Sequence, residues 1–236
     1  MKRRGPYAKG IAKRQEILRV ALDVIAAQGI NGTSIKELAA AVDLSQAGLL
    51  HYFNSKEDLF LQILRARDEA DSQQFMGVAQ EDVAAEDPDV ATLYARYFAG
   101  HPELVLVAYL RLAEHNASVP GLVELFSRMS VEAADPASPA RAYFAERNTL
   151  MRTAFTAVLT ELQEQGRVDP QADPELLARA LQAVSDGLQL QSLADPDLDI
   201  SHAIEQVLRL LVPGLDLSGS PLAQEAPYDA TPSDAE

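Results

Sequence analysis

The chain of 236 residues contains no cysteine. This absence excludes disulfides, thiolate zinc sites, iron–sulfur clusters and cysteine nucleophiles, and it fits a reducing compartment. No apolar run approaches the roughly 18 to 20 residues that a membrane helix requires. The first residues, Met1 to Pro6, also lack the apolar stretch of a secretory signal. We therefore expect a cytoplasmic protein.

Positive charge is scarce and unevenly distributed, since 20 Lys and Arg residues face 35 Asp and Glu residues. Residues 1–67 hold eleven of the basic and six of the acidic residues, which gives this segment a net charge of +5. Residues 68–236 carry a net charge of −20, and every lysine lies before residue 57. Such asymmetry favours nucleic-acid contact by the basic segment. The alternative is a basic terminus on an acidic protein.

Apolar residues recur at helical spacing along the chain, and no convincing strand alternation is present. The first predicted helix runs from Ile11 to Gln28, and Gly29 suits its C-terminal end. Proline and glycine then divide the chain into further segments. We expect an all-α fold with later helices at about 35–42, 46–52, 55–72, 88–100, 102–116, 120–133, 138–166, 174–193 and 199–213.

Two short predicted helices, joined by Asp43-Leu44, have the size of a helix-turn-helix. Ser34 and Glu37 form a capping-box pattern at the start of the first, and Ser45 is a plausible N-cap of the second. These caps predict that both helices begin sharply. The alternative is a three-helix packing unit whose small polar face contacts only water.

The second short helix has side chains that suit the major groove of DNA. Gln46 can donate to and accept from an adenine edge, and the small Ala47 and Gly48 permit a close approach. His51 and Tyr52 can hydrogen-bond with phosphates or bases. Lys56 adds a cation beside backbone N–H groups at a helix start, where an anion is favoured.

Residues 33–60 resemble the DNA-binding domain of the TetR family of transcriptional regulators, and with the first helix the match covers about residues 11–60. Gly48, Phe53 and residues 55–59 (Ser-Lys-Glu-Asp-Leu) occupy positions typical of the family. Asp43 departs from the usual turn, and His51 stands where the family has a tyrosine. The resemblance implies a DNA-contacting set comprising Thr33, Ser34, Ser45, Gln46, Ala47, Gly48, Leu49, His51, Tyr52 and Lys56.

The domain organisation expected from this resemblance has four parts. Residues 1–10 form a flexible basic arm, which either reaches DNA or is a solvated terminus. Residues 11–54 form the helix-turn-helix domain. Residues 55–214 form a larger helical effector-binding and dimerisation domain, entered through a connecting helix at 55–73. Residues 215–236, rich in Ser, Pro, Ala and Asp, are expected to form a disordered acidic tail.

Residues beyond about 68 carry no motif for catalysis or phosphate binding. The four histidines are scattered, so we expect no metal, no cofactor and no enzymatic activity. The resemblance implies instead a cavity for a small effector. Its candidate wall residues are Tyr109, Leu112, His115, Leu150, Met151 and Phe155, although aromatic residues and methionine at helical spacing more often belong to plain core packing.

The last two predicted helices carry apolar stripes. The resemblance implies that these helices pair with their symmetry mates in a homodimer, although both stripes could face the core of their own subunit. The candidate interface residues are Leu177, Leu181, Val184, Leu188, Ile200, Ile204, Val207 and Leu211.

The sequence therefore predicts a homodimeric transcriptional repressor. It would bind a pseudo-palindromic operator in double-stranded DNA and release it when a small molecule fills the acidic part of the chain. The alternative is a helical ligand-binding or protein-interaction module that binds no operator.

Overall fold

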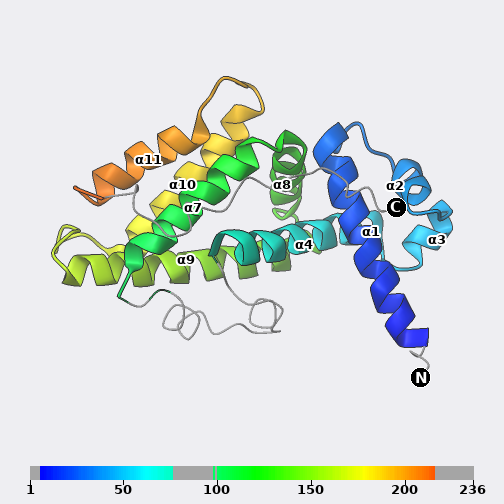
Figure 1. Ribbon diagram of the computed structural model, residues 1–236, viewed down its shortest axis with the longest axis horizontal. Coiled ribbons are helices and arrows are strands. Elements are labelled where there is room, and N and C mark those ends of the chain that lie inside the picture. Colours follow the sequence, from blue (N-terminus) through cyan, green and yellow to red (C-terminus); the bar gives the residue numbers. More distant parts are fainter. Residues whose placement is uncertain (1–5, 77–97, 99, 216–236) are drawn as a thin grey trace, which may run out of the picture.

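The protein is described here by a computed structural model, in which residues 6–76, 98 and 100–215 are placed well enough to describe. This part of the chain is helical and contains no strand, which confirms the all-α prediction. Figure 1 shows an elongated molecule with α1, α2 and α3 at one end. The helices are α1 (Pro6–Gln28), α2 (Ile35–Ala41), α3 (Gln46–Leu50), α4 (Lys56–Met76), α7 (Pro102–Ala117), α8 (Pro120–Glu132), α9 (Ala140–Glu164), α10 (Pro174–Ser192) and α11 (Ile200–Leu211).

The helix bounds lie within two residues of the predictions, except at the start of α1 and the end of α4. Helix α1 begins at Pro6, five residues before the predicted start, so the part of the expected arm from Pro6 to Gly10 is helical. Proline suits a first helical turn because its missing N–H would have no partner there. Residues 1–5, nearly all of the predicted helix at 88–100 and the predicted tail from residue 216 lie outside the described residues.

We call α1 to α3 the head and α7 to α11 the body. One hydrophobic core joins the head to α4, α8 and the start of α9, and Ile17, Leu38 and Leu49 are buried in it. The backbones of α1 and α8 approach closely, because a Cβ on Gly121 would lie 2.1 Å from the Ile25 carbonyl oxygen. Beside this contact, the Glu124 carboxylate accepts a hydrogen bond from the Ile30 N–H at 3.1 Å. The head is therefore attached to the body through α8 as well as through α4.

A second hydrophobic core lies within the body and is built from α7, α9, α10 and α11. Helix α9 lies against α10, and α11 packs on α7 and α10. Figure 1 shows α4 running from the head along α9 into the body. Within the described ranges, no helix is both long enough and apolar enough to cross a bilayer. The arrangement leaves α3 at the surface of the head and the polar residues of α4, α7, α9 and α10 facing one another inside the body.

Candidate nucleic-acid interface and effector pocket

The start of α2 is fixed by a complete capping box. Ser34 Oγ accepts a hydrogen bond from the Glu37 N–H at 3.2 Å, and the Glu37 carboxylate accepts one from the Ser34 N–H at 2.7 Å. These bonds from the Ser34 side chain and backbone lower the pKa of Glu37. The predicted cap is therefore present, and it defines where α2 begins.

The turn between α2 and α3 depends on a left-handed residue. Asp43 has φ 55°, a backbone conformation that glycine and asparagine adopt with less strain than most other residues. The Leu44 N–H then donates to the Ala39 carbonyl at 2.8 Å, which closes the turn onto the end of α2. The departure from the family pattern at Asp43 thus falls at the position where the turn reverses the chain.

Helix α3 presents one face to solvent and one to the core. Ser45 is its N-cap, with Oγ accepting from the Gly48 N–H at 3.0 Å. Leu49 is fully buried and anchors the helix, whereas Gln46, Ala47 and His51 are exposed. This polarity leaves the predicted base-reading residues free of intramolecular packing, as a helix that enters the major groove requires.

Two residues of the predicted DNA-contacting set are internal. Thr33 is only 5% exposed, and its hydroxyl donates to the Gly29 carbonyl oxygen at 2.7 Å, which ties the turn to the end of α1. Leu49 is 0% exposed. Their side chains therefore support the interface from within. Because both side chains are buried, they are not placed to contact DNA as predicted. Helical phase explains Leu49, since it lies two positions after the exposed Ala47 and therefore on roughly the opposite side of α3 from it.

Leu50 was not among the predicted residues, although it is 38% exposed on α3. It lies four residues after Gln46 and therefore shares its face of the helix. An exposed leucine here can contact a thymine methyl group, which is an apolar feature of the major groove. The four-residue spacing from Gln46 was the sequence signal that could have found it.

Gly48 has a structural role beside its small size. A Cβ at this position would lie 3.2 Å from Ser45 Oγ, so a larger residue would press on the N-cap of α3.

The two aromatic residues of the predicted DNA-contacting set, His51 and Tyr52, differ in their surroundings. His51 is exposed, whereas Tyr52 is half-buried and packs against the core of the head. Of these two residues, His51 is the more exposed.

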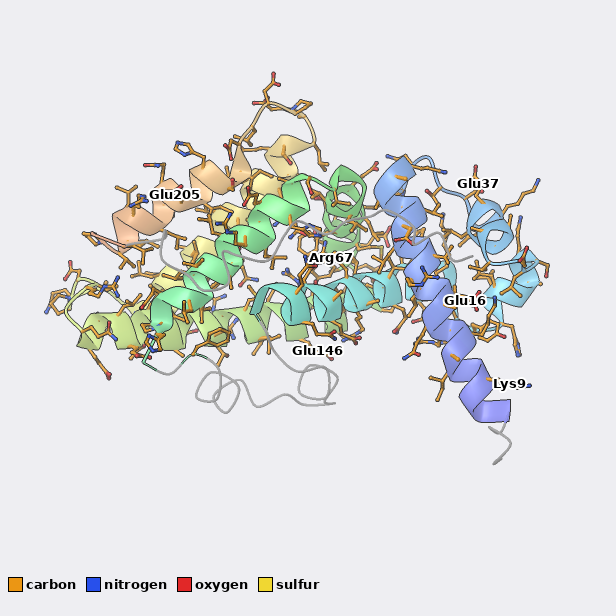
Figure 2. All side chains as sticks on the ribbon, viewed as in Figure 1. Lys9, Glu16, Glu37, Arg67, Glu146 and Glu205 are labelled. Carbon is orange, nitrogen blue, oxygen red and sulfur yellow. The ribbon has the colours of Figure 1, made fainter. Side chains whose placement is uncertain are left out.

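Exposed lysines flank the short helices. Lys56 begins α4, with its Nζ 5.3 Å from the centre of the Phe60 ring, and Lys36 is exposed on α2. Lys13 is less available, because its Nζ donates to Glu16 at 2.8 Å and to the Val42 carbonyl at 3.1 Å. Figure 2 shows Lys9, Glu16 and Glu37 at the end of the molecule that carries the head. Lys36 was not among the predicted DNA-contacting residues, although it lies on the first short helix, two residues after the predicted Ser34.

A narrow polar pocket lies in the body among α7, α9, α10 and α11. As it stands, it has room for little more than one water molecule. Its wall is lined by Tyr109, Leu112, Ala113, Asn116, Arg147, Met151, Gln182, Ser185, Asp186, Gln189 and Ile204. The described residues contain no group of three His, Asp or Glu side chains placed to hold a metal.

Three of the six predicted effector residues line this pocket, namely Tyr109, Leu112 and Met151. Phe155 lies behind the wall, fully buried, with its ring centre 4.7 Å from that of Tyr109. His115 is half-buried outside the lining, and Leu150 is exposed at the surface of α9. The predicted set was mostly apolar and did not include the polar lining residues Asn116 on α7, Arg147 on α9, and Gln182, Ser185, Asp186 and Gln189 on α10.

Four charged side chains meet beside the pocket, and we call them the inner ion cluster: Arg67, Asp68 and Asp71 on α4, and Arg147 on α9. Arg67 donates through Nη2 to Asp68 Oδ1 at 3.0 Å, and its Nε lies 3.6 Å from Asp71 Oδ2. Arg147 Nε lies 3.3 Å from Asp68 Oδ2, and the Tyr143 hydroxyl donates to the same carboxylate. Figure 2 shows Arg67 deep within the molecule. Since Arg147 also lines the pocket, the cluster joins the pocket directly to α4.

The inner ion cluster shifts the pKa values of its members in opposite directions. Burial works against the charged form of Asp68, but Arg147 and Arg67 outweigh it and lower the pKa. Burial raises the pKa of Asp71 to about 6, because Arg67 compensates this carboxylate only in part. Burial also raises the pKa of Tyr109 to about 12, so its phenol is neutral at pH 7.

Comparison with known proteins identifies the family. The model "Bacterial regulatory proteins, tetR family" matches residues 17–63, and the model "BetI-type transcriptional repressor, C-terminal" matches residues 130–215. Together the matches span most of the head and the body. The chain belongs to the TetR family of transcriptional regulators.

Individual TetR relatives are distant. RutR, an HTH-type transcriptional regulator from Escherichia coli (strain K12), is 41% identical over 54 residues, which are 23% of this chain and 26% of RutR. The chain thus matches only about a quarter of the length of that relative. KstR2, an HTH-type transcriptional repressor from Rhodococcus jostii (strain RHA1), is 27% identical over 169 residues, covering 72% of this chain and 74% of KstR2. A TetR transcription regulator from Haloarcula marismortui has the same fold, with a TM-score of 0.63 at 18% identity over 85% of this chain and 98% of that one.

The stripes that the sequence analysis assigned to a TetR dimer face partly inward. Leu181, Ile200 and Ile204 are buried in the core of their own subunit. The remaining stripe residues, which are half-buried, are Leu177, Val184, Leu188, Val207 and Leu211. The surface of α10 carries Leu176, Ala180, Ala183, Gly187 and Leu190 instead. The inward orientation, which the sequence left open, therefore holds for the three buried residues, because α10 and α11 use those positions to pack on α7 and α9.

Proposed function

We propose that the protein is a transcriptional repressor that binds a pseudo-palindromic operator as a homodimer and releases it when a small effector occupies the body. The observation that carries this proposal is the orientation of α3. Its buried Leu49 and capped start hold Gln46, Ala47, Leu50 and His51 at the surface of the head. The uneven distribution of charge supports contact between the head and DNA, because the strongly negative body repels DNA while the basic segment at residues 1–67 attracts it.

A mobility shift across a series of salt concentrations tests operator binding. The probe is DNA from immediately upstream of the protein's own coding region, with a scrambled duplex of equal length as the control. We expect preferential binding to the upstream fragment, with an affinity that falls steeply as salt rises, because phosphate contacts release counterions. Equal binding to both duplexes, or no binding at any salt concentration, would support the alternative of a module without operator function.

Two variants separate phosphate contact from base reading. Lys56→Ala should weaken binding to every sequence and reduce the salt slope by about one unit. Gln46→Ala should relax the choice at one base position, at a cost of about 1 to 3 kcal/mol. Arg209→Ala on α11, at the far end of the body, removes the same charge as Lys56→Ala and serves as its control. Identical behaviour of Lys56→Ala and Gln46→Ala on specific and random DNA would show that α3 is not the reading helix.

The exposed face of α10 supports the homodimer. Leu176 and Leu190 are 62% and 58% exposed, and Ala180, Ala183 and Gly187 lie between them at three- and four-residue steps. A side chain at Gly187 would meet only open space within the subunit. Small residues flanked by leucines let a second helix approach closely and bury the leucines. Leu210 on α11, 80% exposed, is a further large apolar side chain at the surface of the body.

Sedimentation equilibrium tests this dimer. Ala183→Arg should convert a dimer of twice the 25.6 kDa chain mass into a monomer, because a buried arginine without a partner is costly at an interface. Ala117→Arg, an identical change at the exposed end of α7, should leave the mass unchanged. A wild-type chain that sediments as a monomer at micromolar concentration would contradict the homodimer.

For an effector to release the operator, it needs to bind only modestly more tightly to one shape of the body than to the other. An effector that favours the shape with misplaced α3 helices by about 1 to 3 kcal/mol would weaken operator binding about 5- to 150-fold. The pocket beside Arg147 supports this role, since a ligand there contacts the same side chain that pairs with Asp68 on α4. The proposal contains no chemical step, so the effector should be recovered unchanged.

A further inference from the structure

The charges inside the body do not cancel. The inner ion cluster itself is balanced, because Arg67 and Arg147 face Asp68 and Asp71 at 3.0 to 3.6 Å. Asp186 on α10 adds a third carboxylate to the same interior, in the wall of the pocket. Its electrostatic partner is Arg147, which already lies 3.3 Å from Asp68. The inner ion cluster and Asp186 together therefore carry one negative charge more than positive when all five groups are ionised.

The carboxylate of Asp186 has no direct basic partner. Among residues 6–76 and 100–215, no Lys, Arg or His nitrogen lies within 4.0 Å of its oxygens. Burial accordingly raises the pKa of Asp186, and Arg147 offsets that effect only in part. Asp186 is half-buried and has no basic nitrogen in direct contact, so a proton or a cation that reaches this carboxylate is bound favourably.

Two wall groups near Asp186, Gln182 and Ser185, leave acceptor oxygens available to a ligand. Gln182 commits its Nε2 to Asn148 Oδ1 at 2.8 Å, which leaves its carbonyl oxygen available. Ser185 commits its hydroxyl proton to the Leu181 carbonyl at 3.1 Å. Arg147 is held by Asp68, which keeps its charge directed at α4. An ammonium, amidinium or guanidinium group carries several N–H donors and a positive charge, and it complements this set.

We propose that the pocket binds the positively charged group of a small organic cation, an amine, amidine or guanidine, against the carboxylate of Asp186. The proposal rests on the effector function proposed above and names the chemical class of the effector. Leu112, Met151 and Ile204, also in the wall, accommodate a short apolar chain on the same ligand. Because the pocket is narrow, the ligand must separate α7 from α10, and that displacement acts on Arg147 and its contact with α4.

Thermal unfolding of the full-length protein with three probes of equal size tests the charge preference. The probes are n-butylammonium chloride, 1-butanol and sodium butyrate at matched ionic strength. Butylammonium should raise the Tm in a saturable manner, by about 3 to 6 °C at ten times its Kd. Butanol and butyrate should not. Isothermal titration calorimetry of the same probes checks that the shift reports binding.

Two variants locate the bound cation. Asp186→Asn should abolish the shift with butylammonium, whereas Asp197→Asn, which removes an exposed carboxylate in the loop before α11, should retain it. A shift that survives in Asp186→Asn would show general attraction to the acidic surface and would overturn the proposal. Binding of butyrate in preference to butylammonium, or no binding of any probe by the wild-type protein, would overturn it as well.

Operator binding by the wild-type protein is measured in parallel. Specific DNA binding without any response to butylammonium would refute only the cationic effector. A saturable response to butylammonium in a protein that binds no operator would refute the repressor function and leave the cation site standing.

Discussion

The head and the body are both built from α-helices, but they place their polar side chains differently. The head buries apolar residues such as Ile17, Leu38 and Leu49 and keeps its polar groups outside, where they can meet DNA. The body carries arginine and aspartate inside, at the junction of α4, α7, α9 and α10, where a ligand can reach them. An apolar core gives a rigid reading surface, whereas a buried ion cluster is sensitive to any charge brought near it. Four changes test this contrast.

The largest effect is expected from breaking the inner ion cluster. Arg147→Met should lower the free energy of unfolding by about 3 to 5 kcal/mol, because it leaves the Asp68 carboxylate short of a partner in the interior. Arg128→Met breaks an exposed pair with Glu132 at 3.6 Å on α8 and should cost less than about 1 kcal/mol. Urea unfolding followed by circular dichroism measures both. Equal costs would mean that the body draws no more stability from buried charges than from surface charges.

Adjacent leucines on α3 separate packing from DNA contact in the head. Leu49→Ala should cost about 2 to 5 kcal/mol of stability, since it empties a fully buried site. Leu50→Ala, at a position that is 38% exposed, should cost less stability than Leu49→Ala while weakening specific DNA binding. Chemical unfolding and mobility shifts on the same two variants give the comparison. A Leu50→Ala protein with wild-type operator affinity would remove that residue from the interface.

The buried charge of Asp71 makes the body sensitive to pH. Its pKa of about 6 lies above the ordinary value of 3.8, so the folded chain holds this proton more tightly than the unfolded chain. The corresponding stability is present at low pH and is lost as the pH rises from about 4 through about 6. Relative to Asp71→Asn, the wild type should lose about 2 kcal/mol between pH 4 and pH 7. Parallel stability curves for the two proteins would show that Asp71 does not titrate in this range.

The smallest effect is expected at the turn of the head. Asp43→Gly should stabilise the protein by up to about 1 kcal/mol, because glycine adopts the φ of 55° without a Cβ penalty. Asp43→Val should destabilise it by more than that amount, since a β-branched side chain is strained in this conformation. The Tm of each variant decides the point. A lower Tm for Asp43→Gly would indicate that the aspartate side chain contributes a contact of its own to the turn.

Sequence reasoning succeeded where structure depends on near neighbours. The caps at Ser34 and Ser45 join residues three positions apart, so their pattern predicted where α2 and α3 begin. It failed at the start of α1, where residues 1–10 were expected to form a flexible arm although Pro6 already begins the helix. It also assigned Thr33 and Leu49 to the DNA surface, because a family pattern marks positions in a segment and does not say which side chains point inward.

In the body, sequence reasoning found the right helices and only part of the site. Tyr109, Leu112 and Met151 lie in the pocket wall, but the polar residues opposite them come from α9 and α10. The pair of Asp68 with Tyr143 joins residues 75 positions apart, and no local pattern announces it. The stripes on α10 and α11 were correctly seen as apolar, while the choice between core and partner depended on how these helices rotate against α7 and α9.

Taken alone, the order of residues determined that the chain is helical, where most helices begin and end, and that a basic segment at residues 1–67 resembles a TetR DNA-binding domain. Those properties depend on caps, turns and periodicity, which act over a few residues. Only the tertiary structure decided that two arginines and three aspartates meet inside the body, that one of those aspartates is left unpaired, and which faces of α10 and α11 remain at the surface. These outcomes depend on the rotation and close approach of helices that are far apart in the chain, and such packing is set by the whole core at once.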